Sequence, residues 1–263
     1  MATQDNTIAG SGYGNVYIDS LIWGDGWTGS PITYSFRSGI DYKTGYGYFA
    51  GASWSSAETN AVASILNSYS AVCNVTFSRS ADNSTSANLG FWSVSSYVTG
   101  GHQGEFETPN NTHPQLSGYF NYSDPGYWYL QPGGQGYEVF VHEIGHALGL
   151  AHPHDGGGEY DKTIFPGVTE VIPGFPIFGY TTGNNGLNQR IWTVMSYNPG
   201  WAALPKTNNG YGDASTPMAF DIAALQALYG ANTSYHTGDD SYVLPTSDTE
   251  LPPINSLPRV TYN

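Results

Sequence analysis

The chain has 263 residues, of which 39% are hydrophobic and 15% aromatic; it can therefore bury a core, which excludes global disorder. Seven Lys and Arg residues against 21 Asp and Glu residues give a formal net charge of −14, which argues against binding to nucleic acid or to an anionic membrane. There is no apolar run of about 18 residues, so no membrane span is predicted, and the 34 Gly and 16 Pro residues predict many turns and long irregular connections.

Strands and one amphipathic helix are predicted in the first part of the chain. Residues 32–36, 74–77 and 89–94 have the composition of strands. Ser55 and Glu58 have the spacing of a capping box, so a helix is expected over residues 55–72. Apolar residues recur along it at helical intervals and form one stripe: Ala61, Val62, Ile65, Leu66, Tyr69 and Val72.

Cys73, the only cysteine, follows this helix. A single cysteine excludes an intrachain disulfide. We interpret it as a small buried apolar residue.

Two further helices are predicted in the second part. Residues 137–148 form the first, with Gly149 as its stop. Residues 153–190 are rich in Gly and Pro and are interpreted as a long ordered loop. A third helix is expected to begin with Thr216 as N-cap and Pro217 as its first residue. Its buried face would hold Met218, Ile222, Leu225 and Tyr229, and Gly230 would end it.

The segment 142–152 carries the strongest chemical signal, because it reads HEIGHALGLAH and matches H-E-x-x-H-x-x-G-x-x-H at every fixed position. His142 and His146 are four residues apart and project from one helix face, so both can bind one cation. Gly149 can end the helix in a left-handed turn. The chain can then fold back and bring His152 to the same ion.

Three neutral imidazoles with an open fourth position are typical of a catalytic zinc site. Water on such a zinc has a pKa near 7, and Glu143, about 100° around the helix axis, can border the ion and act as general base. A bare H-E-x-x-H also occurs by chance on helix surfaces. That reading is disfavoured here, because the helix is apolar nearly all round and buried His and Glu side chains are costly unless something satisfies them.

Met195 lies in the segment Val194-Met195-Ser196-Tyr197. Alone it would be an ordinary core residue. Together with the long histidine motif and Pro153, this segment resembles the Met-turn of the metzincin metalloendopeptidases, and in particular the serralysin family. Residues 217–218 and the segments 221–226 and 228–232 add to the resemblance, which spans roughly residues 30–245.

The resemblance implies a set of roles for the site. His142, His146 and His152 would ligate zinc, and Glu143 would be the general base. Tyr197 would ligate zinc in the resting enzyme and swing away to hydrogen-bond the oxyanion, so it is both a metal and a catalytic candidate. Met195 would form the apolar floor of the site.

The resemblance also implies that the substrate lies extended along an edge strand, for which Gly104, Glu105 and Phe106 are the best match. Glu105 and Glu107 have two readings. Either they would attract basic side chains of the substrate, or they are charges that keep an edge strand from pairing with another chain. We prefer the second interpretation.

The expected fold is α+β and metzincin-type. A twisted mixed sheet and helices would form an N-terminal lobe over about residues 1–149. The zinc cleft would separate it from a smaller, irregular C-terminal lobe over about 150–235 with one long helix. Residues 236–263 would be a tail or stub.

The leading hypothesis for function is a secreted zinc endopeptidase that acts on protein or peptide substrates, with a protein inhibitor as a further candidate partner and a monomer as the expected state. Residues 1–6 have no signal-peptide features, so export without an N-terminal leader is expected. Calcium has no support in this chain, because the glycine-aspartate repeat array usual in the family is not found. Two alternatives stay open. One is a non-catalytic adhesion or glycan-binding domain, and the other is a latent enzyme whose N-terminal residues occupy the cleft.

Overall fold

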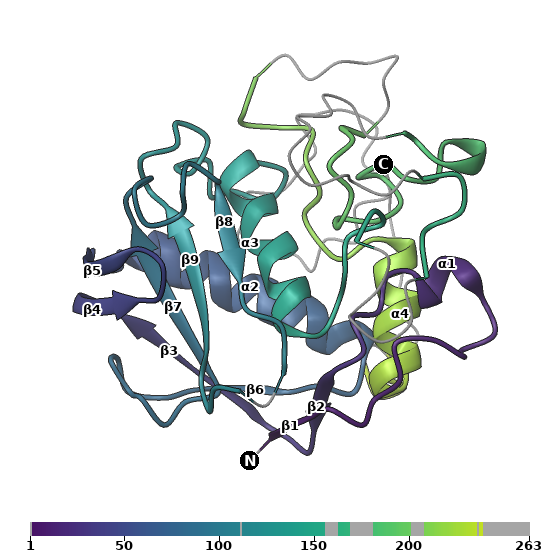
Figure 1. Ribbon diagram of the computed structural model, residues 1–263, viewed down its shortest axis with the longest axis horizontal. Coiled ribbons are helices and arrows are strands. Elements are labelled where there is room, and N and C mark those ends of the chain that lie inside the picture. Colours follow the sequence, from purple (N-terminus) through teal and green to yellow (C-terminus); the bar gives the residue numbers. More distant parts are fainter. Residues whose placement is uncertain are drawn as a thin grey trace.

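A five-stranded mixed sheet is the largest sheet in the part of the chain that the structure describes (Figure 1). The computed structural model describes residues 2–110, 112–155, 163–168, 181–200, 208–235 and 237–238. The strands lie in the order β6 (Phe77–Arg79), β3 (Ile32–Arg37), β7 (Leu89–Val94), β9 (Leu116–Asn121) and β8 (Gly104–Phe106). Neighbours pair in parallel except β8, which is antiparallel to β9 and lies at the edge. The expected α+β class with a mixed sheet is therefore confirmed.

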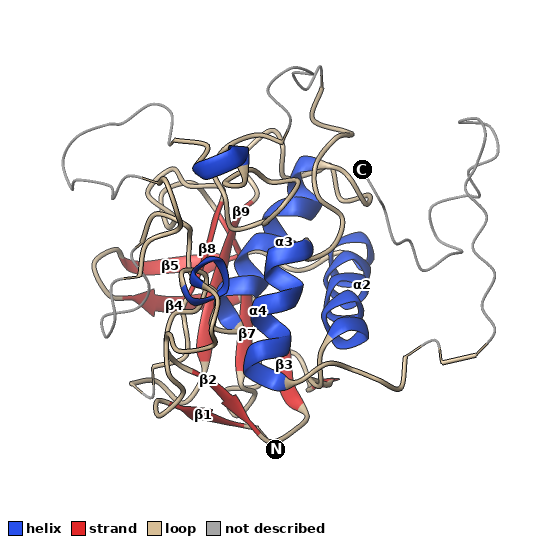
Figure 2. Cartoon of the chain, turned by 90° about the vertical axis from the view of Figure 1, so that its right-hand side faces the viewer, coloured by secondary structure: helices blue, strands red, loops and turns tan. Residues whose placement is uncertain are grey.

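Two helices, α2 (Ser56–Val72) and α3 (Gln135–Ala147), pack beside the sheet (Figure 2). Phe120 of β9 stacks on Phe140 of α3 with ring centroids 4.1 Å apart. The fully buried Tyr69 hydroxyl of α2 donates to the Val141 carbonyl of α3 at 2.7 Å. These contacts fix α3, which carries the histidine motif, against both the sheet and α2.

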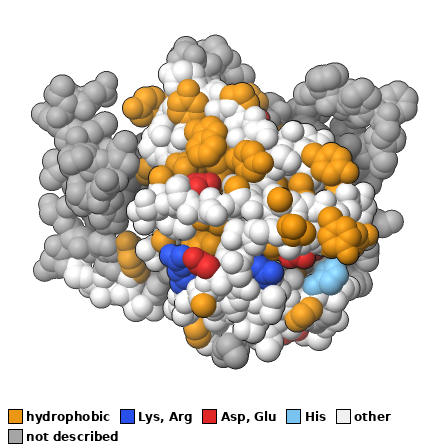
Figure 3. All heavy atoms as spheres, turned by 90° about the vertical axis from the view of Figure 1, so that its left-hand side faces the viewer, with side chains coloured by type: hydrophobic (Ala, Val, Ile, Leu, Met, Phe, Trp, Pro, Cys, Tyr) orange, Lys and Arg blue, Asp and Glu red, His pale blue; other side chains and the backbone are white. Residues whose placement is uncertain are grey.

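The opposite face of the sheet is covered by a hairpin of β4 (Gly39–Lys43) and β5 (Gly47–Gly51), which the sequence did not lead us to expect. Phe49 of the hairpin packs on Trp92 and Tyr119 of the sheet. The outward side of the hairpin exposes large apolar side chains, and hydrophobic groups gather on this side of the molecule (Figure 3).

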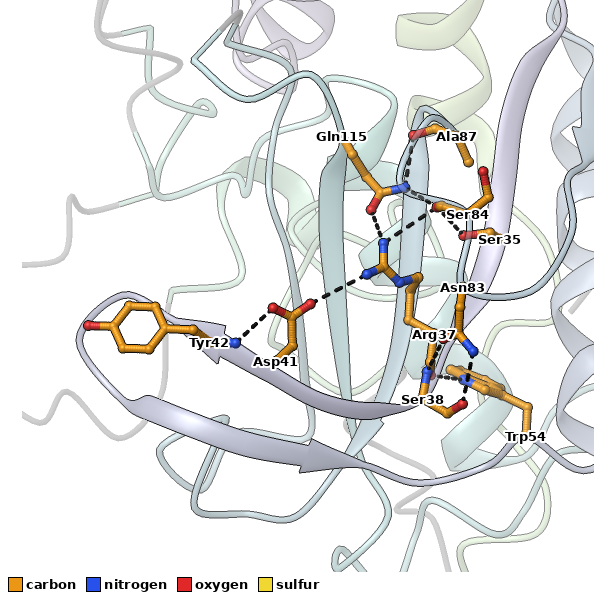
Figure 4. Close-up of polar contacts among 10 residues, drawn as sticks. All are labelled: Ser35, Arg37, Ser38, Asp41, Tyr42, Trp54, Asn83, Ser84, Ala87 and Gln115. Atoms are coloured by element: carbon orange, nitrogen blue, oxygen red, sulfur yellow. Dashed lines mark hydrogen bonds and ion pairs between the residues drawn. The ribbon is translucent and has the colours of Figure 1, made fainter.

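Arg37, the last residue of β3, connects the hairpin to the segments that precede β7 and β9 (Figure 4). Its guanidinium donates to Gln115 Oε1 at 2.6 Å and pairs with Asp41 of β4 at 3.4 Å. It also lies over the ring of Trp92. The buried cation is thus held by a carboxylate, an amide and an aromatic face.

The remaining elements are short, apart from one helix. Strands β1 (Thr3–Asp5) and β2 (Gly26–Thr28) pair antiparallel, and α1 (Val16–Asp19) and the 3₁₀ turn η1 (Asn184–Gly186) lie in the connections. Helix α4 (Ala219–Tyr229) packs against α1 and α2. No helix in the part of the chain that the structure describes has the length and apolar character needed to cross a bilayer.

The predicted helix over residues 55–72 is confirmed together with its capping box. The Glu58 carboxylate accepts from the Ser55 amide at 2.7 Å, and Ser55 Oγ accepts from the Glu58 amide at 3.3 Å. The stripe residues are buried from Ala61 to Tyr69. Cys73 is fully buried, as expected, and burial raises its thiol pKa to about 12.

The predicted strand over residues 74–77 is wrong except at its last residue, because β6 begins at Phe77. Cys73 forms a bridge with Ala231, and the Asn74 amide donates to the Gly230 carbonyl. Residues 73–74 are therefore paired with the residues that follow α4 rather than with a strand of the sheet. The predicted strands near 32–36 and 89–94 are confirmed as β3 and β7.

The predicted start of the third helix is also wrong. α4 begins at Ala219, with Met218 rather than Thr216 at the N-cap. Asp221 lies in the first turn of α4, and its carboxylate accepts a hydrogen bond from the N-cap amide of Met218 at 2.8 Å. This bond gives a partner to a backbone donor at the start of the helix. Gly230, with φ +77°, ends the helix as expected.

Other predictions are met in part or not tested. The second helix runs from Gln135 to Ala147 instead of 137–148, and the described parts of the loop 153–190 contain only the turn η1. The division into two lobes near residue 149 stays a prediction. Nearly all of the expected tail 236–263 lies outside the described residues.

Candidate metal centre

Three imidazoles from α3 and the turn after it converge on one point. His142 and His146 lie one helical turn apart on α3, and both are buried. His152 Nε2 lies 3.1 Å from His142 Nε2 and 3.0 Å from His146 Nε2. The structure thus brings together the three histidines that the motif singled out.

Hydrogen bonds at the other ring nitrogens define the tautomers. His142 Nδ1 lies 2.7 Å from the Val194 carbonyl oxygen and His146 Nδ1 lies 2.8 Å from that of Leu150. A carbonyl only accepts, so both Nδ1 atoms carry a proton. His152 Nδ1 lies 2.7 Å from Asp155 Oδ2. Burial raises the pKa of Asp155, but the hydrogen bonds from His152 act against burial, and the pKa is lowered to about 2, so this contact is also to an acceptor.

Three lone pairs on Nε2 atoms therefore face one another. Such an arrangement is repulsive unless a cation lies between them. Tetrahedral zinc with Zn–N bonds near 2.0–2.1 Å would space its nitrogen ligands by about 3.3 Å, close to the separations found here. The donor set thus fits a zinc ion that is bound through three neutral imidazoles.

Burial favours the neutral form of the two helical imidazoles, His142 and His146. It lowers the pKa of His142 well below the usual range, and the charges of His146 and His152 add to the effect. It also lowers the pKa of His146 to about 3. A neutral imidazole is the form that ligates a metal.

The turn after α3 depends on Gly149. Its φ is +90°, in the left-handed region, and its amide donates to the His146 carbonyl at 2.9 Å. The N-terminal segment fixes the turn, because the Trp23 amide donates to the Gly149 carbonyl and the Ala151 amide to the Leu21 carbonyl. The chain is thereby redirected, so that His152 returns to the two helical histidines.

Glu143 lies beside the edge strand β8. The side chain is 6% exposed, and burial raises its carboxyl pKa well above the usual range, with the nearby charges of Glu105 and Glu138 adding to the shift. The Phe106 backbone N–H of β8 opposes the shift by a hydrogen bond. A Cβ at Gly104 would lie 2.9 Å from Glu143 Cγ and 3.0 Å from Val139 Cγ1. Glycine at this position therefore lets β8 approach α3 closely.

Glu105 points to the other face of β8 and forms an ion pair with Lys43 of the hairpin. Glu107 accepts from the Ser117 amide at 2.8 Å and lies 3.7 Å from His113 Nδ1. Both acidic side chains therefore have partners within the fold, which agrees with the reading that they are structural charges of an edge strand.

Met195 and Tyr197 flank the site from the C-terminal segment. Met195 is fully buried, and its Sδ would lie 2.8 Å from a Cβ on Gly145, so it packs directly against α3 between the two helical histidines. Tyr197 is 43% exposed, with its ring centroid 4.6 Å from that of His152 and 5.8 Å from that of His142.

Three groups support the site, and sequence reasoning missed two of them, Asp155 and Asp221. Asp155 orients His152, and His154 is buried and stacks on the His152 ring at 4.9 Å with an interplanar angle of 9°. Asp221 is fully buried and accepts from Thr193 and Val194 in the segment that holds Met195. Only Asp155 had a usable signal, since it follows a proposed ligand by three residues.

Comparisons with known proteins agree with this geometry. Residues 47–158 match the peptidase M10 family, described as matrixin. The chain is 30% identical over 219 residues to Serralysin G of Dickeya chrysanthemi, a match that covers 81% of the chain and 42% of that relative. It is 30% identical over 239 residues to Metallopeptidase AprA of Pseudomonas marginalis, covering 80% of the chain and 42% of the relative. Serralysin C of Dickeya chrysanthemi is 37% identical over 136 residues, which cover 51% of the chain and 24% of the relative. The chain thus spans less than half the length of these relatives.

Proposed function

Because this chain is a serralysin-like metzincin domain, we propose that it is a zinc-dependent endopeptidase. His142, His146 and His152 would hold the zinc, and Tyr197 would be a further ligand in the resting state. The observation that carries the proposal is the convergence of three Nε2 lone pairs beside a buried carboxylate, Glu143, at the edge of a sheet.

The substrate is proposed to lie along β8, at Gly104, Glu105 and Phe106, as an added strand. β8 is three residues long and pairs only on its β9 side among the residues that the structure describes. Glu143 and Gly104 are in contact distance, so a peptide on β8 would pass next to the general base.

Zinc, when bound, acidifies water and polarises the scissile carbonyl. Glu143 accepts a proton from the attacking water as the new carbon–oxygen bond forms, and it donates that proton to the leaving amine as the carbon–nitrogen bond breaks. Its burial supports this role, because a raised pKa makes the carboxylate a stronger base. Tyr197 donates its hydroxyl proton in a hydrogen bond to the carbonyl oxygen, which becomes negative in the transition state.

The test is casein hydrolysis by wild-type protein and by Glu143→Gln, with zinc content measured by mass spectrometry on the same samples. The proposal expects one zinc per chain in both and hydrolysis only in the wild type. A zinc-loaded wild type without turnover would instead favour the alternative, a non-catalytic adhesion or glycan-binding domain. A variant that remains active would reject the role of Glu143.

Tyr197→Phe tests the second catalytic candidate separately. Loss of one oxyanion donor costs about 10²–10³ in turnover. We expect kcat to fall by that factor while zinc is retained, and an unchanged kcat would remove Tyr197 from the mechanism.

We further propose a secreted monomer that acts on extended protein or peptide segments and is open to a protein inhibitor in the same cleft. The lobes would meet at the site, near residue 149. These proposals rest on the resemblance to the serralysins.

A further inference from the structure

We propose that Thr193 and Asp221 are positioning residues that hold the His142 imidazole in its zinc-binding orientation through the peptide group between Val194 and Met195. The inference rests on the proposed zinc site and adds to it two residues that do not touch the metal, the water or the substrate.

A continuous chain of hydrogen bonds connects His142 to Asp221. His142 Nδ1 donates to the Val194 carbonyl at 2.7 Å, and the amide of the same peptide, Met195 N, donates to Thr193 Oγ1 at 3.2 Å. Thr193 Oγ1 then donates to Asp221 Oδ1 at 2.6 Å. Every donor in the chain points away from the metal site, so one peptide group and one hydroxyl connect a carboxylate to the ring of a ligand.

The carboxylate at the end of the chain is fixed on both of its oxygens. Asp221 Oδ2 accepts from the Val194 and Met218 amides at 2.8 Å each. Asp221, Thr193 and Val194 are all fully buried, so water does not compete for these bonds. In a buried network each polarised bond strengthens the next, and a negative group at the far end makes the Val194 carbonyl a better acceptor.

The dependence is specific to one of the three histidines. His146 Nδ1 donates to Leu150 within the turn after α3, and His152 Nδ1 donates to Asp155, three residues away. Both partners are local in sequence. Only His142 is oriented by a group from the C-terminal segment, 52 residues away. Breaking the chain at Thr193 should therefore loosen one imidazole and leave the other two in place.

This positioning role also explains why the Asp221 carboxylate is buried near the site, although the burial of a charged group costs free energy. Groups that orient metal ligands typically change metal affinity by 10–100-fold when they are removed. Because Thr193 acts through one intervening peptide, we expect an effect at the lower end of that range.

The test compares Thr193→Val with Thr193→Ser. Valine has nearly the same shape but no hydroxyl, so it breaks the chain on both sides, whereas serine retains the hydroxyl. The zinc Kd is measured by competition with a chromogenic chelator, and kcat and KM for a peptide substrate are measured on zinc-saturated protein. We expect about a tenfold weaker Kd and a lower kcat with an unchanged KM for Thr193→Val, and values within twofold of the wild type for Thr193→Ser.

Ser55→Ala is the control for a general loss of stability, because it removes a helix cap remote from the site. Its zinc Kd should be unchanged. The inference is overturned if Thr193→Val binds zinc as the wild type does, if serine fails to restore the Kd, or if Ser55→Ala weakens binding equally.

If Thr193→Val does not fold, Asp221→Asn replaces it. The carboxamide retains an acceptor for the Val194 and Met218 amides but removes the charge, and a Kd equal to that of the wild type would overturn the inference. A wild-type protein that binds no zinc would instead refute the proposed function, so the two failures are distinguishable.

Discussion

Gly149 allows a quantitative test of the turn that returns His152 to the site. Its φ of +90° is a conformation that costs a residue with a Cβ roughly 1–2 kcal/mol. A Cβ there would also overlap the backbone carbonyl oxygen of Asp25, which cannot rotate away as a flexible side chain would. Overpacking of this kind typically costs about 1–3 kcal/mol. Gly149→Ala is therefore expected to lower the free energy of unfolding by about 2–5 kcal/mol.

Gly39 provides a matched control. Its φ is +89°, but nothing lies within 4 Å of the position of its Cβ. Gly39→Ala should carry only the backbone cost, about 1–2 kcal/mol. Urea unfolding of the chelator-treated proteins measures both values. Equal losses in the two variants would show that the overlap with Asp25 contributes nothing, and a Gly149→Ala protein as stable as the wild type would refute the reasoning altogether.

Three further measurements follow from the structure. Ser55→Ala should lower the free energy of unfolding by about 1 kcal/mol through loss of the α2 cap, whereas Ser56→Ala next to it should change it by less than about 0.5 kcal/mol in the same urea titration. Burial raises the pKa of Asp221 from 3.8 to about 6, so the folded state holds a proton that the unfolded chain releases. The stability of the wild type relative to Asp221→Asn should then fall, on the order of 3 kcal/mol, as the pH rises from about 4 to about 6, and a flat difference across that window would contradict the shift. Zinc at a hundredfold excess over its Kd should stabilise the wild type by about 2.7 kcal/mol, seen as a higher Tm in calorimetry, and should stabilise His152→Ala far less.

The burial of Asp221 also bears on the balance between stability and function. Ionisation at neutral pH works against the folded state, yet the ionised form is the one that accepts three hydrogen bonds beneath the metal centre. A stabilised Asp221→Asn protein with weaker zinc binding would be a case in which a functional group is retained at the expense of stability.

Features that depend on short spacings along the sequence were the ones that could be predicted. The helix over residues 55–72, its capping box and the histidine motif depend on spacings of three and four residues, which a helix converts directly into neighbours on one face. The incorrect starts of β6 and α4 have different causes. Residues 73–74 pair with residues 230–231, a contact between distant segments that has no local pattern. The start of α4 is set by a local contact, because Asp221 accepts from the Met218 amide three residues before it, and the interpretation of Thr216 and Pro217 as the helix start overlooked it.

The sequence by itself therefore predicts which residues would hold zinc and which carboxylate would act beside it, since His142, Glu143 and His146 share one helix and Gly149 permits the turn to His152. Only the tertiary structure decided what holds His142 in place and which strand lies at the sheet edge. The Val194 carbonyl, the Thr193 hydroxyl and the Asp221 carboxylate reach His142 from another part of the chain, and β8 becomes an edge strand through its pairing with β9. Such contacts form between segments tens of residues apart, and they arise from the packing of the whole core rather than from the periodicity of any one segment.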